Sequence, residues 1–121
     1  MSLRSQLEDI LKDLKSTGDI EASAIVSRDG LLIAADISAN VNAEAFAAMS
    51  ATMLGAAETA MTELGKGIPD RVVVESSNGK IVATGAGEKA LLVVMTSPKA
   101  NLGLILLQIG KASRRVEELL G

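Results

Sequence analysis

Apolar residues recur at helical spacing at the start of the chain. The positions that form this stripe are Leu3, Leu7, Ile10, Leu11 and Leu14. Intervals of three and four residues place them on one side of an amphipathic helix. Gly18 follows the stripe, and a glycine at this point is typical of a helix C-terminus. The pattern predicts a helix from about Leu3 to Leu14.

Shorter apolar stretches predict five strands, in a pair and a triple. They are Ile20–Arg28, Leu31–Asp36, Arg71–Ser77, Lys80–Ala86 and Ala90–Met95. Asp29-Gly30 and Asn78-Gly79 each separate two of these stretches, and such dipeptides favour a type I′ hairpin turn because both residues tolerate positive φ. The run Leu91–Val94 does not alternate with polar residues, so we expect this last strand to be buried on both faces at the centre of the sheet.

Two further helices are predicted, at Ala43–Leu64 and from about Asn101 to Leu120. The first of them follows Asn42, a good N-cap, and ends before Gly65. Its charged residues are Glu44, Glu58 and Glu63, and nearly all the others are small or apolar. A helix that is apolar nearly all round is expected to be buried nearly all round. One small sheet does not cover both sides of such a helix, so its methionines form either plain core or an adaptable interface.

The order of elements is therefore α-β-β-α-β-β-β-α, an α/β (α+β) fold. We expect one domain, over residues 1–121, with a mixed five-stranded sheet and helices on both faces. The first and last helices are expected on one face and the middle helix on the other. The hairpins place the second strand beside the first, and the fifth, fourth and third strands next to one another.

Composition removes several classes of function. The chain has 121 residues, a net charge of −3, one aromatic residue (Phe46), and neither cysteine nor histidine. Disulfides, thiolate nucleophiles, cysteine–histidine zinc sites and Ser–His–Asp triads are thereby excluded. An acidic chain without aromatic stacking platforms argues against binding to nucleic acid or to an anionic membrane. Without an apolar run of membrane-spanning length or a signal peptide, we expect a cytoplasmic protein.

One segment matches the letters of a cofactor motif but lacks its context. Gly85-Ala86-Gly87-Glu88-Lys89-Ala90 fits G-x-G-x-x-A, which binds a dinucleotide only where a helix follows the glycines. Here an apolar strand follows, so we interpret the segment as a β-turn. The carboxylates are spread mainly along helix exteriors, where solvated faces explain them. We therefore predict no catalytic, cofactor-binding or metal-binding residue, and no enzyme.

Several of these features together resemble the Roadblock/LC7 family, in its prokaryotic, MglB-like form. They are the order of elements, the Asp29-Gly30 and Asn78-Gly79 hairpins, the Ala- and Met-rich middle helix, and the segment Asn101-Leu102-Gly103-Leu104. The resemblance extends over roughly Leu3 to Leu120. It implies a profilin/longin-like fold, and together with the hairpins it predicts the strand order 2-1-5-4-3.

The resemblance also implies a homodimer, in which the middle helices pair and the third strands join two sheets into one. The residues favour the same arrangement, because a valine-rich edge strand at 71–75 promotes aggregation unless it is paired. Antiparallel pairing with a second copy satisfies this edge and closes the assembly. The predicted interface residues are Phe46, Met49, Ser50, Met53, Ala57, Val72 and Val74.

For function, the resemblance implies a non-catalytic regulatory scaffold that binds and modulates a Ras-like small GTPase. A purely structural adaptor or dimerisation module, and a small-ligand sensor domain, stay open as alternatives. If the dimer stimulates GTP hydrolysis, positioning of the switch loops is favoured over a supplied arginine finger. Arg28, beside the Asp29-Gly30 turn, is the better candidate for such a finger.

Overall fold

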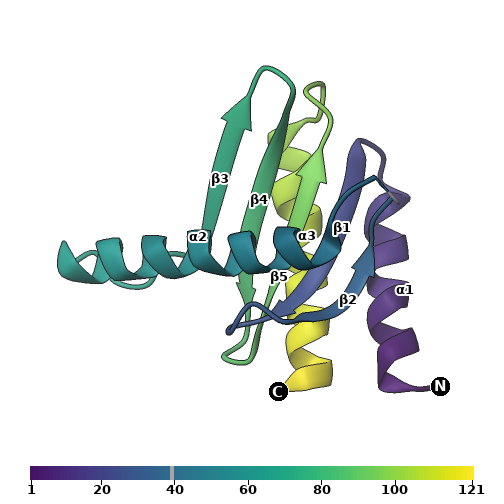
Figure 1. The fold of residues 1–121 in the computed structure, drawn as a ribbon, viewed down its shortest axis with the longest axis horizontal. Coiled ribbons are helices and arrows are strands. Elements are labelled where there is room, and N and C mark those ends of the chain that lie inside the picture. The colour runs from purple at the N-terminus through teal and green to yellow at the C-terminus, as the bar shows by residue number, and fades with distance from the viewer. Residues whose placement is uncertain (39) are drawn as a thin grey trace.

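The computed structural model describes residues 1–38 and 40–121, and its elements follow the predicted order (Figure 1). The helices are α1 (Leu3–Lys15), α2 (Ala43–Glu63) and α3 (Leu102–Leu120). The strands are β1 (Ile20–Ser27), β2 (Leu32–Asp36), β3 (Arg71–Ser76), β4 (Gly79–Ala86) and β5 (Ala90–Thr96). Each helix begins after an N-cap residue whose side chain accepts a backbone hydrogen bond, namely Ser2, Asn42 and Asn101.

The strands form one sheet in the order β2-β1-β5-β4-β3, as predicted. Every neighbouring pair is antiparallel, so the expectation of a mixed sheet is wrong. The reason lies in the crossover through α2: it joins β2 and β3, which run in the same direction but occupy opposite edges of the sheet. The central position of β5 is confirmed, because Leu91–Val94 are at most 1% exposed.

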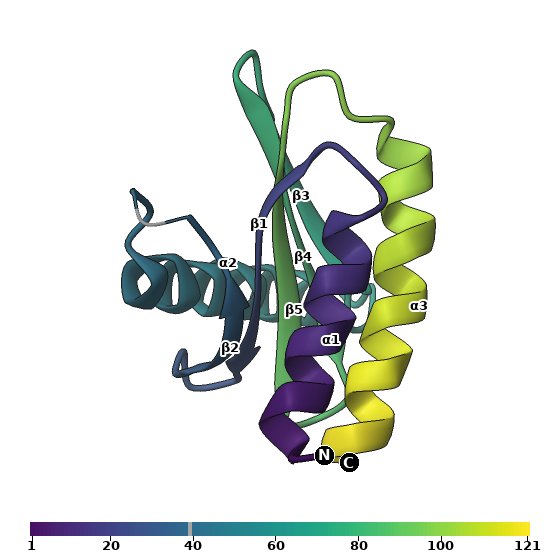
Figure 2. The same ribbon diagram turned by 90° about the vertical axis from the view of Figure 1, so that its right-hand side faces the viewer.

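Helices α1 and α3 cover one face of the sheet and α2 covers the other (Figure 2). The core beneath α1 and α3 is the larger and includes Leu7, Leu11, Ile25, Leu92, Val94, Ile109 and Val116. The core beneath α2 contains Ala24, Val26, Phe46, Ala47, Leu54, Ala83, Leu91 and Val93. Helix α2 crosses this face at one level only, and its C-terminal half extends beyond β3 (Figure 1). A single copy of the chain therefore does not bury α2 all round.

Both predicted hairpins are present, but their turns are not type I′. Gly30 and Gly79 have positive φ, whereas Asp29 and Asn78 do not. In the first turn Gly30 N–H donates to Ser27 O (2.9 Å) and Ser27 N–H donates to Leu31 O (2.8 Å), so the loop is one residue longer than a type I′ turn allows. In the second turn Ser76 pairs directly with Gly79. Gly30 thus supplies the positive φ of the first turn alone, whereas Gly79 is the first residue of β4 and the second turn, Ser77-Asn78, contains no residue with positive φ.

Gly79 also sits where a side chain does not fit. A Cβ atom at this position would lie 2.5 Å from the backbone oxygen of Thr96 on β5. We expect Gly79→Ala to lower the free energy of unfolding by about 2–3 kcal/mol, because the backbone of a central strand has to move. Urea unfolding measures this loss.

Gly110→Ala in α3 is the matched control. The nearest atom to a Cβ at that position is the flexible Arg114 Nη1, at 3.9 Å. Because alanine favours a helix more than glycine does, the free energy of unfolding of this variant should rise by about 0.5–1 kcal/mol. Equal stability of the two variants would contradict the steric argument.

Candidate functional site

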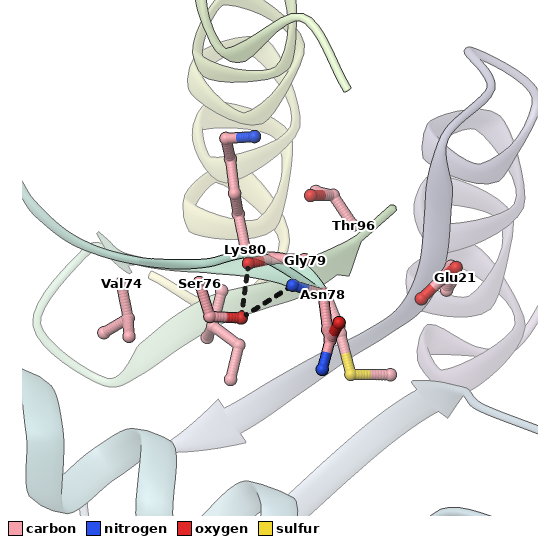
Figure 3. Close-up of a pocket in the computed structure, with 9 residues that line it drawn as sticks. Glu21, Val74, Ser76, Asn78, Gly79, Lys80 and Thr96 are labelled. Carbon is pink, nitrogen blue, oxygen red and sulfur yellow. Dashed lines mark hydrogen bonds between the residues drawn. The ribbon is translucent and has the colours of Figure 1, made fainter. Parts of the chain in front are cut away.

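The face of the sheet that carries α2 has a hollow of about 240 Å³ beside the β3–β4 turn (Figure 3). We call it the sheet groove. Its apolar part consists of Val74, Ile81 and Met95, and its polar lining residues are Glu21, Ser76, Asn78, Gly79, Lys80 and Thr96. In Figure 3, Val74 and Asn78 lie on one side of the strands, whereas the Lys80 side chain points to the other. The Lys80 ammonium donates to Pro98 O at 3.4 Å. The groove is thus an apolar strip of bare sheet with a mostly polar rim.

A second hollow, of about 140 Å³, connects the sheet groove with the side of α2. It is lined by Phe46, Met49, Ser50, Met53 and Ile81, and Ile81 lines the sheet groove as well. Met49 is 64% exposed, although it belongs to a helix with few charges. The two hollows make one apolar surface, which runs from the methionine side of α2 across β4 to Val74. A surface of this kind is typical of a protein–protein contact.

The predicted interface residues differ in how accessible they are. Phe46 and Ser50 are buried within their own protomer, where Ser50 Oγ donates to Phe46 O at 2.7 Å. Met53, Ala57 and Val72 are half-buried, and Met53 and Val72 pack against the core beneath α2. Met49 and Val74 are exposed. The structure thus brings Phe46, Met49, Ser50 and Met53 together around one hollow and places Val74 in the adjoining groove.

Strand β3 occupies one edge of the sheet, and among residues 1–38 and 40–121 its one partner strand is β4. Its six residues pair in an unbroken register, so the outer edge is regular. Strand β2 occupies the other edge, but it is shorter and its pairing with β1 contains an irregularity between Ile25 and Val26. Short and irregular edge strands pair poorly with other chains. The edge that is suited to pairing is therefore that of β3, beside the sheet groove.

The part of α2 that extends beyond β3 leads into an apolar segment. Leu64, which caps the helix, is 72% exposed, and Ile68 in the following loop is 77% exposed. The end of α2 itself lies past the edge of the sheet, on the same side of the sheet as the sheet groove (Figure 1).

The opposite side of α2 is fastened to its own sheet by Arg28. Arg28 Nη1 lies 3.2 Å from Glu58 Oε2 on α2, and Nη2 donates to Gly87 O at 2.7 Å in the β4–β5 turn. Gly85 makes room for this side chain, because a Cβ there would lie 2.8 Å from Nη2. The candidate arginine finger is therefore engaged within the fold. Sequence reasoning missed these contacts because Arg28, Glu58 and Gly87 are far apart in the chain and form no motif.

We expect Arg28→Ala to lower the free energy of unfolding by about 1–2 kcal/mol, because it removes a partly exposed ion pair and a charged hydrogen bond to a backbone oxygen. Thermal or urea unfolding at fixed protein concentration measures the loss. Arg4→Ala is the control for the removal of one positive charge, since Arg4 is exposed, and it should change stability by less than about 0.5 kcal/mol. Equal effects of the two variants would show that the Arg28 contacts contribute nothing.

In the glycine segment 85–87, Gly85 and Ala86 end β4 and Gly87 begins the turn into β5, so a strand follows the glycines where the dinucleotide motif requires a helix. Within residues 1–38 and 40–121, no three acidic side chains are arranged to hold a metal ion. Over the same residues, no helix has the length and apolar character needed to cross a bilayer. The features that stand out are the apolar surface and the β3 edge, which define a domain suited to binding other proteins.

The chain belongs to the Roadblock/LC7 family, whose domain model matches residues 6–96. Roadblock/LC7 domains are regulatory and adaptor domains and not typical enzymes, so this chain has a regulatory adaptor role. A relative from Methanocaldococcus jannaschii, MJ1340, is 36% identical over 111 residues, which cover 92% of this chain and 96% of the relative.

Solved structures show the same fold. A structure of MglB with a tetrameric arrangement matches with a TM-score of 0.88 and 18% identity, over 98% of this chain and 90% of that one. The gliding protein MglB from Thermus thermophilus matches with a TM-score of 0.87 and 19% identity, over 98% and 91%. Profilin II from Acanthamoeba castellanii matches with a TM-score of 0.65 and 18% identity, over 97% and 98%. The predicted resemblance and the profilin-like fold are confirmed.

Proposed function

We propose that this chain is a cytoplasmic, non-catalytic homodimer that binds a Ras-like small GTPase and modulates its nucleotide cycle. The observation that carries the dimer is the extension of α2 past the regular free edge of β3, on the face that bears the sheet groove. The GTPase partner is an inference from the family resemblance.

A two-fold rotation relates these features to one another. If β3 pairs antiparallel with β3 of a second copy, the axis is perpendicular to the sheet and both α2 helices lie on the same face of one continuous sheet. In Figure 1, α2 crosses near the lower end of β3, whereas the β3–β4 turn, whose residues line the sheet groove, lies at the upper end. The rotation reverses β3, so the α2 of the second copy lies at the level of the sheet groove of the first. Each overhanging α2 then lies over the sheet groove of the other copy.

The residues at these positions suit such a contact. The overhanging end of α2 and the loop after it contain the exposed Leu64 and Ile68, and the floor of the groove contains Val74 and Met95. In this arrangement the exposed Met49 lies beside the α2 helix of the second copy. Its flexible thioether adapts well to a protein interface. The related fold described as MglB with a tetrameric arrangement is one example of self-association among similar structures, which supports the proposal.

Sedimentation equilibrium tests the dimer, and we expect a dimer at micromolar concentration. A monomer under these conditions would contradict the proposal. The second part of the proposal is the effect on a GTPase. It is tested by single-turnover GTP hydrolysis by a Ras-like GTPase from the same genome, with and without the dimer. Affinities for the GTP-bound and GDP-bound forms complete it, because a partner shifts a two-state equilibrium only if it discriminates between the states.

The same experiment separates the proposal from a purely structural adaptor. Equal affinity for both nucleotide states, together with an unchanged rate of hydrolysis, would leave only the adaptor function. If the rate does rise, we propose that the dimer positions the switch loops, since Arg28 is held by Glu58 and Gly87. A small-ligand sensor would instead show a rise in melting temperature with a metabolite, through binding to the folded state.

A further inference from the structure

The free edge of β3 presents the backbone groups of alternate residues only. Ser76 pairs with Gly79 across a two-residue turn, so these two residues exchange hydrogen bonds. The pattern alternates along an antiparallel pair, so Val74 and Val72 also exchange hydrogen bonds with β4. The N–H and C=O groups of Arg71, Val73 and Glu75 consequently point outwards, towards the free edge.

The side chains of these three residues share one face of the sheet. Val73 packs against the core beneath α1 and α3, and side chains two positions apart along a strand lie on the same face. Arg71 and Glu75 are both exposed at this edge. Within residues 1–38 and 40–121, neither of them forms an ion pair. Lys80, which is opposite Glu75 on β4, directs its ammonium to Pro98 O instead.

We propose that β3 pairs with β3 of the second copy in the register that sets Val73 opposite Val73, so that Arg71 of each copy faces Glu75 of the other. This inference rests on the proposed homodimer and adds the register of its central strand pair. Two ion pairs then flank the two-fold axis on the α1 and α3 face. On the opposite face, Val72 of each copy meets Val74 of the other.

Backbone geometry limits the alternatives. Residues directly opposite each other in an antiparallel pair have their side chains on the same face of the sheet. One copy of β3 can therefore shift along the other only in steps of two residues, and each step moves the two-fold axis by one residue. Centring the pair on Val73 makes all three outward-facing residues, Arg71, Val73 and Glu75, exchange hydrogen bonds with the second copy.

Centring the pair on Val72 sets Glu75 opposite Pro69, which has no N–H to donate. Centring it on Val74 sets Arg71 opposite Ser77, beyond the end of the strand. Both of these registers lose hydrogen bonds, and both separate Arg71 from Glu75. Oppositely charged residues that face each other across strands stabilise the pairing.

Single cysteines report the register directly, because the chain contains no cysteine of its own. Only a residue that faces itself across the two-fold axis brings two copies of its sulfur together at disulfide distance. We expect Val73→Cys to form a covalent dimer under mild oxidation, and Val72→Cys and Val74→Cys to form far less. Non-reducing electrophoresis, with sedimentation of the reduced proteins, gives both the cross-link and the oligomeric state.

The outcomes separate this inference from the proposed dimer. A cross-link that is strongest at position 72 or 74 would overturn the register and leave the dimer intact. A reduced protein that sediments as a dimer but cross-links at none of the three positions would overturn β3 pairing altogether. Monomeric wild-type protein would overturn the proposed function itself.

Charge exchange tests the ion pairs separately. Arg71→Glu alone and Glu75→Arg alone each place like charges opposite one another at two sites, and each should weaken self-association by about tenfold. An equimolar mixture of the two variants should regain affinity within about twofold of wild type, because the mixed dimer contains two Arg–Glu pairs again. Arg4→Glu, an equal charge change at an exposed site away from β3, is the control.

Recovery in the mixture cannot come from a merely structural role of either residue, since both variants carry their substitutions throughout. If the mixture associates no more tightly than the two single variants, Arg71 and Glu75 do not face each other and the register is wrong.

Discussion

Met49→Glu is expected to leave the protomer folded and to weaken its self-association strongly. Met49 is 64% exposed in the single copy, so a glutamate at this position meets water and disturbs no core. In the proposed dimer it lies beside the second α2, and burial of an unpaired carboxylate in an apolar contact is costly. Two such sites per dimer should raise the dissociation constant by about 10²-fold or more. Sedimentation equilibrium over a range of concentrations measures the change.

Ala48→Glu is the matched control, with the same charge on the same helix. Ala48 is exposed, and it lies beside Gly30 in the β1–β2 turn of its own chain. Because each residue of a helix is rotated by about 100° from the one before, Ala48 points away from the side of α2 that carries Met49 and Met53. Circular dichroism should show that both variants are folded. If Met49→Glu sediments as wild type does, or if Ala48→Glu dissociates equally, the methionine side of α2 is not the contact.

Leu54→Ala should produce the largest loss of stability among the α2 variants, about 2–5 kcal/mol. Leu54 is 1% exposed and fills the space between α2 and the sheet, in the smaller of the two cores. With so few side chains holding α2 down, the cavity left by Leu54 is hard to fill by rearrangement. Urea unfolding at one fixed protein concentration measures the loss, because association also contributes to apparent stability.

Hydrogen exchange should locate the effect of Leu54→Ala in α2. Amides of α2 should lose more protection than those of β5, since a helix held by a small contact opens without unfolding the sheet. Leu31→Ala is the control, because it removes the same side chain at a position that is 70% exposed. It should lower the free energy of unfolding by less than about 0.5 kcal/mol. Uniform loss of protection across the chain would contradict the view that α2 is a separately docked element.

Much of the fold could be predicted because its determinants are local. Hairpin dipeptides join neighbouring strands, and the apolar run Leu91–Val94 requires the centre of the sheet, where both faces are covered. The complete strand order also needed the family resemblance, since the position of the first strand beside the fifth depends on contacts distant in sequence.

Other features could not be predicted, for physical reasons. Turn type depends on the register of the flanking strands, which is why Asp29 and Asn78 lack the positive φ that their dipeptides suggested. The Arg28–Glu58 pair joins segments brought together only by the folded sheet. The composition of α2 predicted burial on every side, but composition does not say which sides are covered by the same copy. That distinction separates Phe46 and Ser50 from Met49 among the predicted interface residues.

The strand order also has a consequence for the order of events in folding. Strands β3, β4 and β5 are consecutive in the chain and pair as a meander, whereas β1 pairs with β5 only after the whole intervening chain has closed as a loop. Local pairings form fastest, because closure of a long loop costs more chain entropy. The outer edge of β3 belongs to the meander, so it exists before β1 joins the sheet. This edge is therefore available for pairing before the chain has completed its fold.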